Sequence, residues 1–316
     1  MPAQHKLTDN FGGFFKRLNP SPTYVRTAAS AQSEIRSLIE SAQGPAGDLR
    51  VKSFIQGSYG RHTAIYTIND VDIVALCSVS HRPTANRNTR NHIFSMIADS
   101  ISADDRYKDK LRYTDQSVCV KVELAGVKVE VLPALRTRGA RFEHEPFWIF
   151  RPGSDPGSAE EWVQTYARRH QVLLSEKNGR TADLFVPIVK VIKHLRSASS
   201  QIDTRDAASY HLESLLYAIR DPVYAGSVCE CTEQVLQAVA GFDAEKAAES
   251  GIRTPCGEKI LFSPEEWALA SYARFNEAAN RWFELARQAN AAVDRDEAVD
   301  LWKLLLGDGF FPRDPE

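Results

Sequence analysis

Residues Phe54–Leu76 read F-I-Q-G-S-Y-G-R-H-T-A-I-Y-T-I-N-D-V-D-I-V-A-L, and this segment decides the fold that we predict. A short apolar run turns at Gly57-Ser58, and a second apolar run follows an Asp-Val-Asp sequence. Side chains two positions apart in a strand point to the same face, so Asp70 and Asp72 should project together. Neighbouring carboxylates repel each other unless they share a divalent cation. The second strand is therefore predicted to begin at a metal site.

The turn before that strand offers groups suited to a phosphate. Gly57 and Ser58 supply backbone N–H groups and a hydroxyl, which are common phosphate donors. Taken alone, a Gly-Ser pair is most often an ordinary turn, and Asp-x-Asp is most often a solvated strand end. Phosphate donors placed ahead of paired carboxylates, with a strand on either side, indicate a nucleotidyltransferase.

Composition sets limits on the class of protein. A chain of 316 residues has room for two domains, and 43% hydrophobic with 25% charged residues is typical of a globular protein. A net charge of −2 gives no support for a surface that coats nucleic acid or a platform for long DNA. Five cysteines favour a reducing compartment. The beginning of the chain lacks a signal-peptide pattern, and no apolar run is long enough for a membrane span, so we expect a cytoplasmic protein.

Apolar periodicity predicts mixed α/β structure followed by helices. Residues 1–20 are expected to be loosely structured because they contain Gly12-Gly13 and Pro20, and residues 136–158 are expected to form a loop. A capping box at Ser263 is expected to open a long helix. The other predicted elements are helices over 23–42, 89–102 and 183–196, strands over 51–56 and 71–77, and a hairpin around residues 125–126.

The motifs G-S-x-x-x-x-T-A-I (residues 57–65), I-K-H-L (192–195) and S-Y-H-L-E (209–213) occur in this order. With them the chain resembles the DNA polymerase β-like nucleotidyltransferase superfamily. Within it, the chain is most similar to the bacterial relatives of animal cyclic GMP-AMP synthase, the cyclic oligonucleotide synthases of anti-phage (CBASS) signalling. The C-terminal W-K-L-L-L-G-D-G-F-F-P also resembles the tail of bacterial members, so the resemblance covers nearly the whole chain.

The resemblance implies a third catalytic acid on the hairpin. The superfamily places it on a strand, usually as Asp before x-x-Pro-Ala, and Glu130 stands in that context here. Glu for Asp departs from the pattern, since the longer side chain moves the carboxylate outward. Glu123 is the competing candidate, but no Pro-Ala sequence follows it.

The resemblance also implies nucleotide contacts in the second half of the chain. Lys193 and Ser209 fall on the positions that bind the triphosphate, and Tyr210 falls on the tyrosine that stacks on a base. Without the resemblance, Lys190 and Lys193 are a lysine pair on one solvated helix face, and Tyr210 is a half-buried core aromatic. Cys229, Cys231 and Cys256 lack a fourth ligand for a structural zinc site, so we expect reduced thiols.

The implied fold is α/β plus α. A nucleotidyltransferase lobe with a short mixed sheet (residues 1–158) precedes a C-terminal helical lobe (residues 159–316), with the site in a cleft between them. Asp70, Asp72 and Glu130 would hold two Mg²⁺ ions, with Mn²⁺ as an alternative. The implied substrates are ATP and a second nucleoside triphosphate, and the product is a cyclic di- or trinucleotide released with pyrophosphate.

The implied partners are an effector protein that the product activates and a regulatory protein. Two other functions stay open at this point. A linear nucleotidyltransferase acting on RNA ends or on a small molecule would use the same acids. A catalytically dead binding module would typically have lost one of the three acids, and all three are present.

Overall fold

The computed structural model describes residues 7–78, 87–114, 116–137, 145–152 and 161–314. The chain divides into two compact units. We call Ser21–His62 with Thr67–Val172 the sheet unit, and Met1–Pro20, Thr63–Tyr66 and Leu173–Glu316 the helical unit. The predicted domain boundary between residues 158 and 159 lies outside the described residues and stays a prediction.

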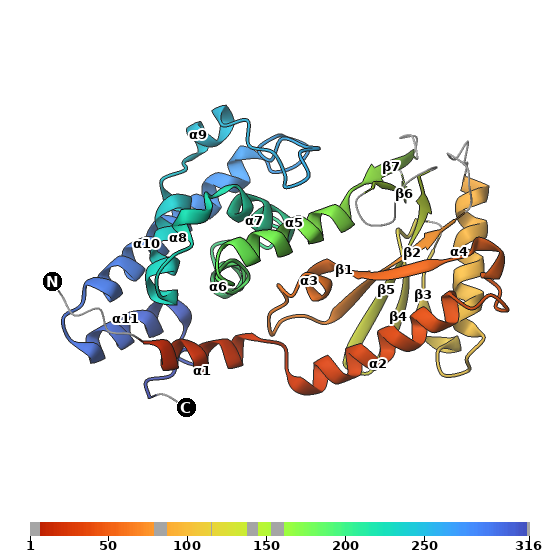
Figure 1. Cartoon of the computed structure of the whole chain (residues 1–316), viewed down its shortest axis with the longest axis horizontal. Helices are drawn as coiled ribbons and strands as arrows, with labels where there is room; N and C mark the ends of the chain where they lie inside the picture. The colour runs from red at the N-terminus through yellow and green to blue at the C-terminus, as the bar shows by residue number, and fades with distance from the viewer. Residues whose placement is uncertain (1–6, 79–86, 115, 138–144, 153–160, 315–316) are drawn as a thin grey trace. The chain divides into compact units, whose positions relative to one another are not determined.

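The described residues of the sheet unit form a mixed seven-stranded sheet (Figure 1). Its order is β1-β2-β5-β4-β3, with β6 paired to β5 and β7 paired to β6. Strands β2 and β5 are parallel, and the other pairs are antiparallel. The strands are β1 (Lys52–Gln56), β2 (Asp70–Cys77), β3 (Leu111–Arg112), β4 (Val120–Leu124), β5 (Val127–Arg136), β6 (Phe147–Arg151) and β7 (Glu161–Thr165).

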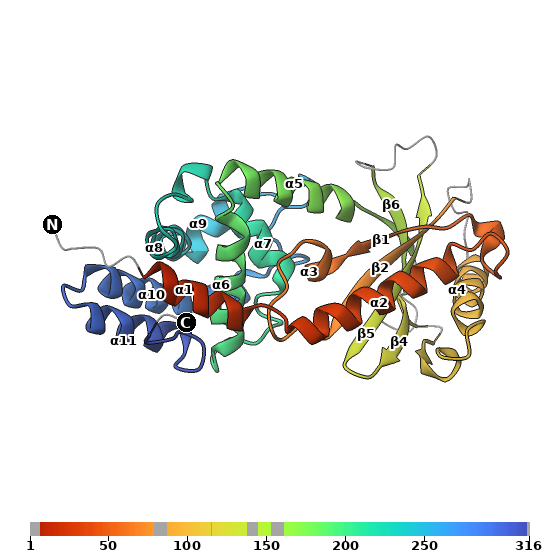
Figure 2. The same cartoon turned by 60° about the horizontal axis from the view of Figure 1, so that its bottom comes forward.

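Two helices, α2 (Pro22–Ile39) and α4 (Arg87–Ser102), cover one face of this sheet (Figure 2). Val71 and Ile73 of β2 pack in the core under these helices, and so do alternate residues of β5. The intervening positions therefore point to the opposite face. Short helical turns complete the unit: α3 (Gly57–Gly60), η1 (Gly47–Leu49) and η2 (Lys108–Lys110).

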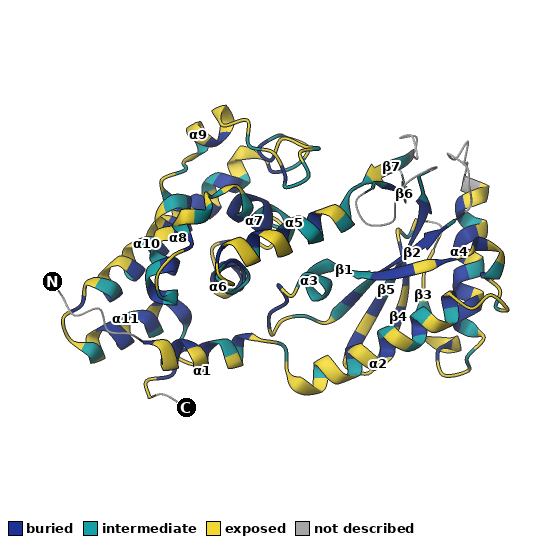
Figure 3. Ribbon diagram, in the orientation of Figure 1, coloured by how far each residue is buried: buried dark blue, intermediate teal, exposed yellow. Residues whose placement is uncertain are grey.

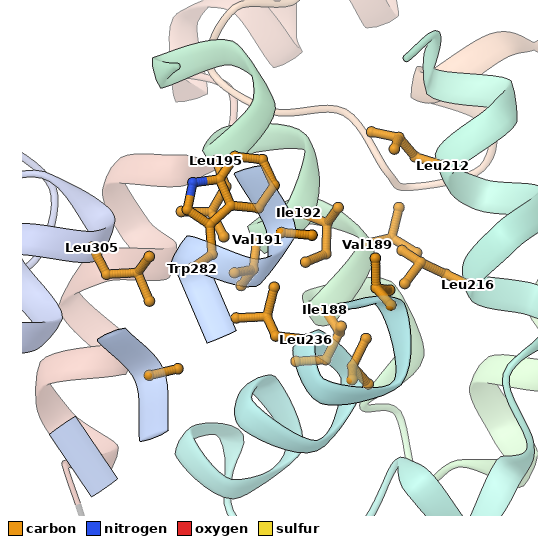
Figure 4. Close-up of a cluster of buried hydrophobic side chains, with 14 of the residues drawn as sticks. Ile188, Val189, Val191, Ile192, Leu195, Leu212, Leu216, Leu236, Trp282 and Leu305 are labelled. Atoms are coloured by element: carbon orange, nitrogen blue, oxygen red, sulfur yellow. The ribbon is translucent and has the colours of Figure 1, made fainter. Parts of the chain in front are cut away.

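The helical unit is built around α6, which is buried along most of its length (Figure 3). Leu212, Leu236 and Trp282 from three other helices surround it in a continuous hydrophobic core (Figure 4). Cys229 and Cys231 are buried on α8. Its elements are α1 (Thr8–Leu18), α5 (Ala167–Arg180, which begins in the sheet unit), α6 (Phe185–Ala198), α7 (Ser209–Ala218), η3 (Asp221–Val223), α8 (Val228–Ala240), α9 (Ala244–Glu249), α10 (Leu269–Ala291) and α11 (Arg295–Leu306).

The prediction for residues 1–20 is wrong, because most of this segment forms helix α1. Phe11 and Phe14 are buried at 1% and 0% exposure, which stabilises the helix despite its two glycines. Gly13 permits the ring of Pro312 to approach helix α1 closely, since a Cβ on residue 13 would lie 2.7 Å from that ring. The glycine pair is thus a packing feature and not a helix breaker.

The predicted start of the last long helix is also wrong. Ser263 opens no helix; α10 begins at Leu269. Trp267 is 1% exposed, and its indole N–H donates to the main-chain oxygen of Asp206 at 2.6 Å. Burial of this indole holds residues 263–268 in an irregular conformation, and so overrides the local capping signal.

The loop predicted over 136–158 is wrong in part, because residues 147–151 form strand β6. Residues 138–144 and 153–158 lie outside the described residues. The predicted helices over 23–42, 89–102 and 183–196, both strands and the hairpin are confirmed, as is the α/β plus α fold class. Among the described helices, none combines the length and the apolar character needed to cross a membrane.

Candidate active site

Three carboxylates lie on the face of the sheet opposite α2 and α4. Asp70 and Asp72 begin β2, and Asp72 is the register partner of Glu130 on the parallel strand β5. Val71 and Val129, which neighbour them along the strands, pack in the core on the other face. The alternation along two adjacent strands therefore brings together the acids that the sequence predicts.

Burial and mutual repulsion raise the pKa of both aspartates. The pKa of Asp72 rises to about 6, first because the group is buried and then because Asp70 and Glu130 are negative; Arg61 acts in the opposite direction. The pKa of Asp70 also rises, through burial and then through the charge of Glu130. Carboxylates in such surroundings gain from a bound cation, because a cation offsets both desolvation and repulsion.

Glu130 has a counter-ion within the sheet. Lys121 stands directly opposite on β4, and its ammonium lies 2.8 Å from Glu130 Oε1. The Cys119 thiol lies 3.5 Å from Glu130 Oε2. The competing candidate, Glu123, pairs in register with Lys128 on the same face. Only Glu130 is in register with Asp72, which keeps it the better candidate for the third acid.

The Gly57-Ser58 turn lies against Asp72. Gln56, the last residue of β1, is the register partner of Asp72, and Gly57 follows it with a φ of +71°. A Cβ on residue 57 would lie 1.7 Å from Asp72 Oδ2, so only glycine fits. Ser58 is the second residue of α3. The turn and the acid strand therefore form one local structure, as the order of the motif predicts.

The acids fit the donor set of a hard cation. Mg²⁺ and Mn²⁺ prefer carboxylate oxygens, and the raised pKa values of Asp70 and Asp72 mark a place where a cation stabilises the site. Within the described part of the chain, no three His, Cys, Asp or Glu side chains are already gathered as metal ligands. To bind a cation, Glu130 would first have to exchange its ion pair with Lys121 for a bond to the metal.

The other three predicted residues lie in the helical unit. Ser209 is the first residue of α7, and its hydroxyl lies 3.5 Å from Arg196 Nη1. Tyr210 is half-buried, and burial raises the pKa of its phenol to about 12. Their nucleotide contacts stay a prediction.

Lys193 is not on a solvated helix face, so the alternative interpretation of Lys190 and Lys193 as a pair of surface lysines is wrong for Lys193, while its predicted contact with the triphosphate is not tested. Its side chain is 2% exposed and forms an ion pair of 2.7 Å with Glu213, whose side chain is 0% exposed. The i, i+3 spacing with Lys190 did not reveal this, because the burial comes from α7 and from Thr63.

Several residues that contact the candidate site residues were not identified from the sequence. Tyr24 of α2 donates its hydroxyl hydrogen to the main-chain oxygen of Asp70 at 3.0 Å. Lys121 faces Glu130 across the sheet, and the strand alternation of the hairpin contained that signal. Thr63 lies in the motif G-S-x-x-x-x-T-A-I and Glu213 lies in S-Y-H-L-E. The motifs did not show that the Thr63 hydroxyl donates to the Glu213 carboxylate.

Comparison with known protein families identifies the family of this chain. The Second Messenger Oligonucleotide or Dinucleotide Synthetase (SMODS) domain matches residues 6–178, more than half of the chain. The chain belongs to the SMODS family. The cGAS/DncV-like nucleotidyltransferase C-terminal helical domain matches residues 173–284 of this SMODS chain. The resemblance found in the sequence, and with it the assignment as a nucleotidyltransferase, is confirmed.

Individual relatives of this SMODS chain support the same assignment. It is 27% identical over 267 residues to a cyclic UMP-AMP synthase from Rhodothermus marinus, covering 79% of this chain and 89% of the relative. A solved structure of a Rhodothermus marinus CdnE c-UMP-AMP synthase with Apcpp and Upnpp has a TM-score of 0.65 and 21% identity, covering 88% and 96%. An Escherichia coli MS115-1 CdnC:HORMA-deltaN complex has a TM-score of 0.72 and 13% identity, covering 97% and 98%.

Proposed function

We propose that this chain joins nucleoside triphosphates into a cyclic di- or trinucleotide second messenger, with release of pyrophosphate, in anti-phage (CBASS) signalling. The observation that carries the proposal is the contact between the Gly57 turn and Asp72, with Glu130 in register beside it. It combines phosphate donors and clustered carboxylates within one small part of the sheet unit.

Each candidate site residue of the sheet unit has a chemical role in this proposal. Asp70 and Asp72 would hold Mg²⁺, with Glu130 joining them as ligand or as the base for the attacking hydroxyl. When bound, the metal ions stabilise the negative charge that develops on the transferred phosphoryl group and lower the pKa of the hydroxyl. The backbone N–H groups of Gly57 and Ser58 would orient the phosphates of the donor nucleotide.

The helical unit would supply nucleotide recognition. Ser209, at the beginning of α7, offers a hydroxyl to the triphosphate, and the half-buried ring of Tyr210 would stack on a base. Lys193 is the third residue that the family resemblance assigns to the triphosphate. Its buried ion pair points to a different role, which we argue separately below.

The substrates that we propose are ATP and a second nucleoside triphosphate. The structural relative that holds Apcpp and Upnpp, and the cyclic UMP-AMP synthase, support a reaction between two different nucleotides. We also propose a cytoplasmic location, an effector protein activated by the product and a regulatory protein partner. The relative in complex with a HORMA protein supports the last of these.

The second candidate is a linear nucleotidyltransferase, because the acids and the turn serve either reaction. Incubation with ATP, GTP, CTP and UTP, followed by phosphatase, separates the two. A cyclic product has no terminal phosphate and survives, whereas a linear product loses its terminal phosphates. A product that phosphatase degrades would favour the linear enzyme.

A further inference from the structure

The segment Thr63–Tyr66 belongs to the helical unit, although the residues on either side of it belong to the sheet unit. Ile65 is 5% exposed and lies in the core of the helical unit. The Tyr66 N–H donates to the main-chain oxygen of Leu18 at 2.8 Å, and its ring packs on that of Phe310. Both backbone and side chains therefore anchor these four residues.

A buried ion pair holds the first residue of this segment. The Lys193 ammonium donates to Glu213 Oε1 at 2.7 Å, to Thr63 Oγ1 at 2.9 Å and to the Thr63 main-chain oxygen at 3.2 Å. The Thr63 hydroxyl donates to the same Glu213 oxygen at 2.7 Å. An ammonium has three protons to donate, and three acceptors lie around this one.

Thr63 lies in the connection between the two halves of the candidate active site. Before it comes the Gly57-Ser58 turn, and after Tyr66 only three residues remain before Asp70. One residue spans at most about 3.6 Å, so the position of Thr63–Tyr66 limits where this connection can lead. A loose segment here would let the turn and the carboxylates adopt unproductive arrangements.

We propose that Lys193 and Glu213 are positioning residues that fix Thr63, and through it the connection between the phosphate-binding turn and the acid strand. Both residues act by holding Thr63 in place, and Lys193 does not bind the triphosphate. The inference rests on the proposed function, since it takes Asp70 and Asp72 as the catalytic carboxylates.

The energetics of buried charge favour this role. If Lys193 turned to a phosphate, the buried carboxylate of Glu213 would lose its 2.7 Å ion pair, which is destabilising. Replacing both partners with apolar side chains of similar size is far less costly, because neither charge of the pair is left buried without the other. The role of Lys193 can therefore be separated from fold stability with a paired substitution.

The experiment compares Lys193→Met, Glu213→Leu and the double variant with the wild-type chain. Each single variant should lower the melting temperature by on the order of 10 °C, and the double variant should recover at least half of the loss. At a temperature where it is folded, the double variant should bind a non-hydrolysable ATP analogue within about threefold of wild type. Its kcat should fall about tenfold or more while KM for ATP is unchanged, since misplacement costs rate and not binding.

Two results would overturn the proposal. A folded double variant that binds the analogue about 10- to 100-fold more weakly would show that Lys193 contacts phosphate. A double variant with lower stability but unchanged kcat and KM would show a purely structural ion pair. Lys190→Met is the matched control, because the Lys190 ammonium donates to the side chain of Asn19 at 2.7 Å and lies outside the buried pair; it should leave melting temperature and kcat unchanged.

Thr63→Val keeps the proposal testable if the charged variants fail to fold, because it retains the shape of the side chain and removes only the hydroxyl. We expect faster hydrogen exchange at the Tyr66 amide and a lower kcat at unchanged KM. Wild-type exchange and kcat in Thr63→Val would contradict the proposal. If the wild-type chain makes no product from any nucleotide, the proposed function fails, while the melting and exchange data still decide whether the ion pair holds Thr63.

Discussion

Asp72 lies against the backbone of Gly57, so closely that a Cβ on residue 57 would stand 1.7 Å from the carboxylate oxygen Oδ2. Gly57 also has a φ of +71°, which side chains rarely tolerate. Two independent constraints thus select glycine at the residue where the phosphate-binding turn meets the acid strand. The geometry of the candidate site depends on this contact.

Gly57→Ala should therefore displace the Asp72 carboxylate and abolish most activity. We expect a loss of at least about 10²-fold in kcat, the scale of a misplaced catalytic group. Gly126→Ala is the matched control, because Gly126 has a φ of +81° but nothing within 4 Å of its Cβ position. If the two variants lose activity equally, backbone strain and not the carboxylate contact is responsible.

The raised pKa of Asp72 predicts a pH-dependent cost to stability. Because its pKa is about 6 in the folded chain and 3.8 ordinarily, the folded state binds a proton more readily than the unfolded state. The contribution of Asp72 to the free energy of unfolding should therefore fall as the pH rises from about 4 to about 6, by on the order of 2–3 kcal/mol. Asp72→Asn removes this titration.

Denaturant titrations of wild type and Asp72→Asn, without added metal, measure the effect at each pH. We expect the variant to be the more stable protein at pH 7 and the difference to shrink toward pH 4. A constant difference across this range would mean that the Asp72 carboxylate has an ordinary pKa. Added Mg²⁺ should raise the stability of wild type more than that of the variant.

Glu130→Gln should reduce the rate by at least about 10²-fold, since it removes a positioned base or metal ligand. Glu123→Gln is the matched control, because Glu123 lies on the same sheet face but its register partner is Lys128 and not Asp72 or Lys121. Steady-state kinetics of both variants give the ranking. A larger loss in Glu123→Gln would place the third acid at Glu123.

Tyr24→Phe tests how helix α2 supports the acid strand. The variant loses the hydrogen bond from the tyrosine hydroxyl to the main-chain oxygen of Asp70, at 3.0 Å in the wild-type chain. We expect a loss of about 0.5–1.5 kcal/mol in the free energy of unfolding, with a modest fall in kcat. Unchanged stability would indicate that water replaces the hydroxyl without cost.

Strand periodicity was enough to predict that two acids of the candidate site in the sheet unit lie together, whereas the third acid, Glu130, came from the family resemblance. The i, i+2 spacing put Asp70 and Asp72 on one face, and the Gly-Ser turn before them marked where phosphate donors belong. The partner strand came from the hairpin around Gly126, whose φ of +81° is the conformation that glycine permits. These are local signals, carried by residues close together in sequence.

What the sequence did not reveal depends on contacts between distant residues. The burial of Lys193 requires Glu213 and Thr63, and helical spacing alone does not show that they meet. The first helix forms around buried Phe11 and Phe14, although its glycines suggested a break. Trp267 overrides a local capping signal in the same way.

The most direct test of the proposed function is mass spectrometry of the products that form from ATP, GTP, CTP and UTP with Mg²⁺, after phosphatase treatment. We expect a phosphatase-resistant cyclic oligonucleotide from the wild-type chain. We expect none from the Asp70→Asn/Asp72→Asn double variant, which should melt at the same or a higher temperature because repulsion between the carboxylates is relieved. Substantial synthesis of the cyclic product by the folded double variant, or only phosphatase-sensitive products from wild type, would contradict it.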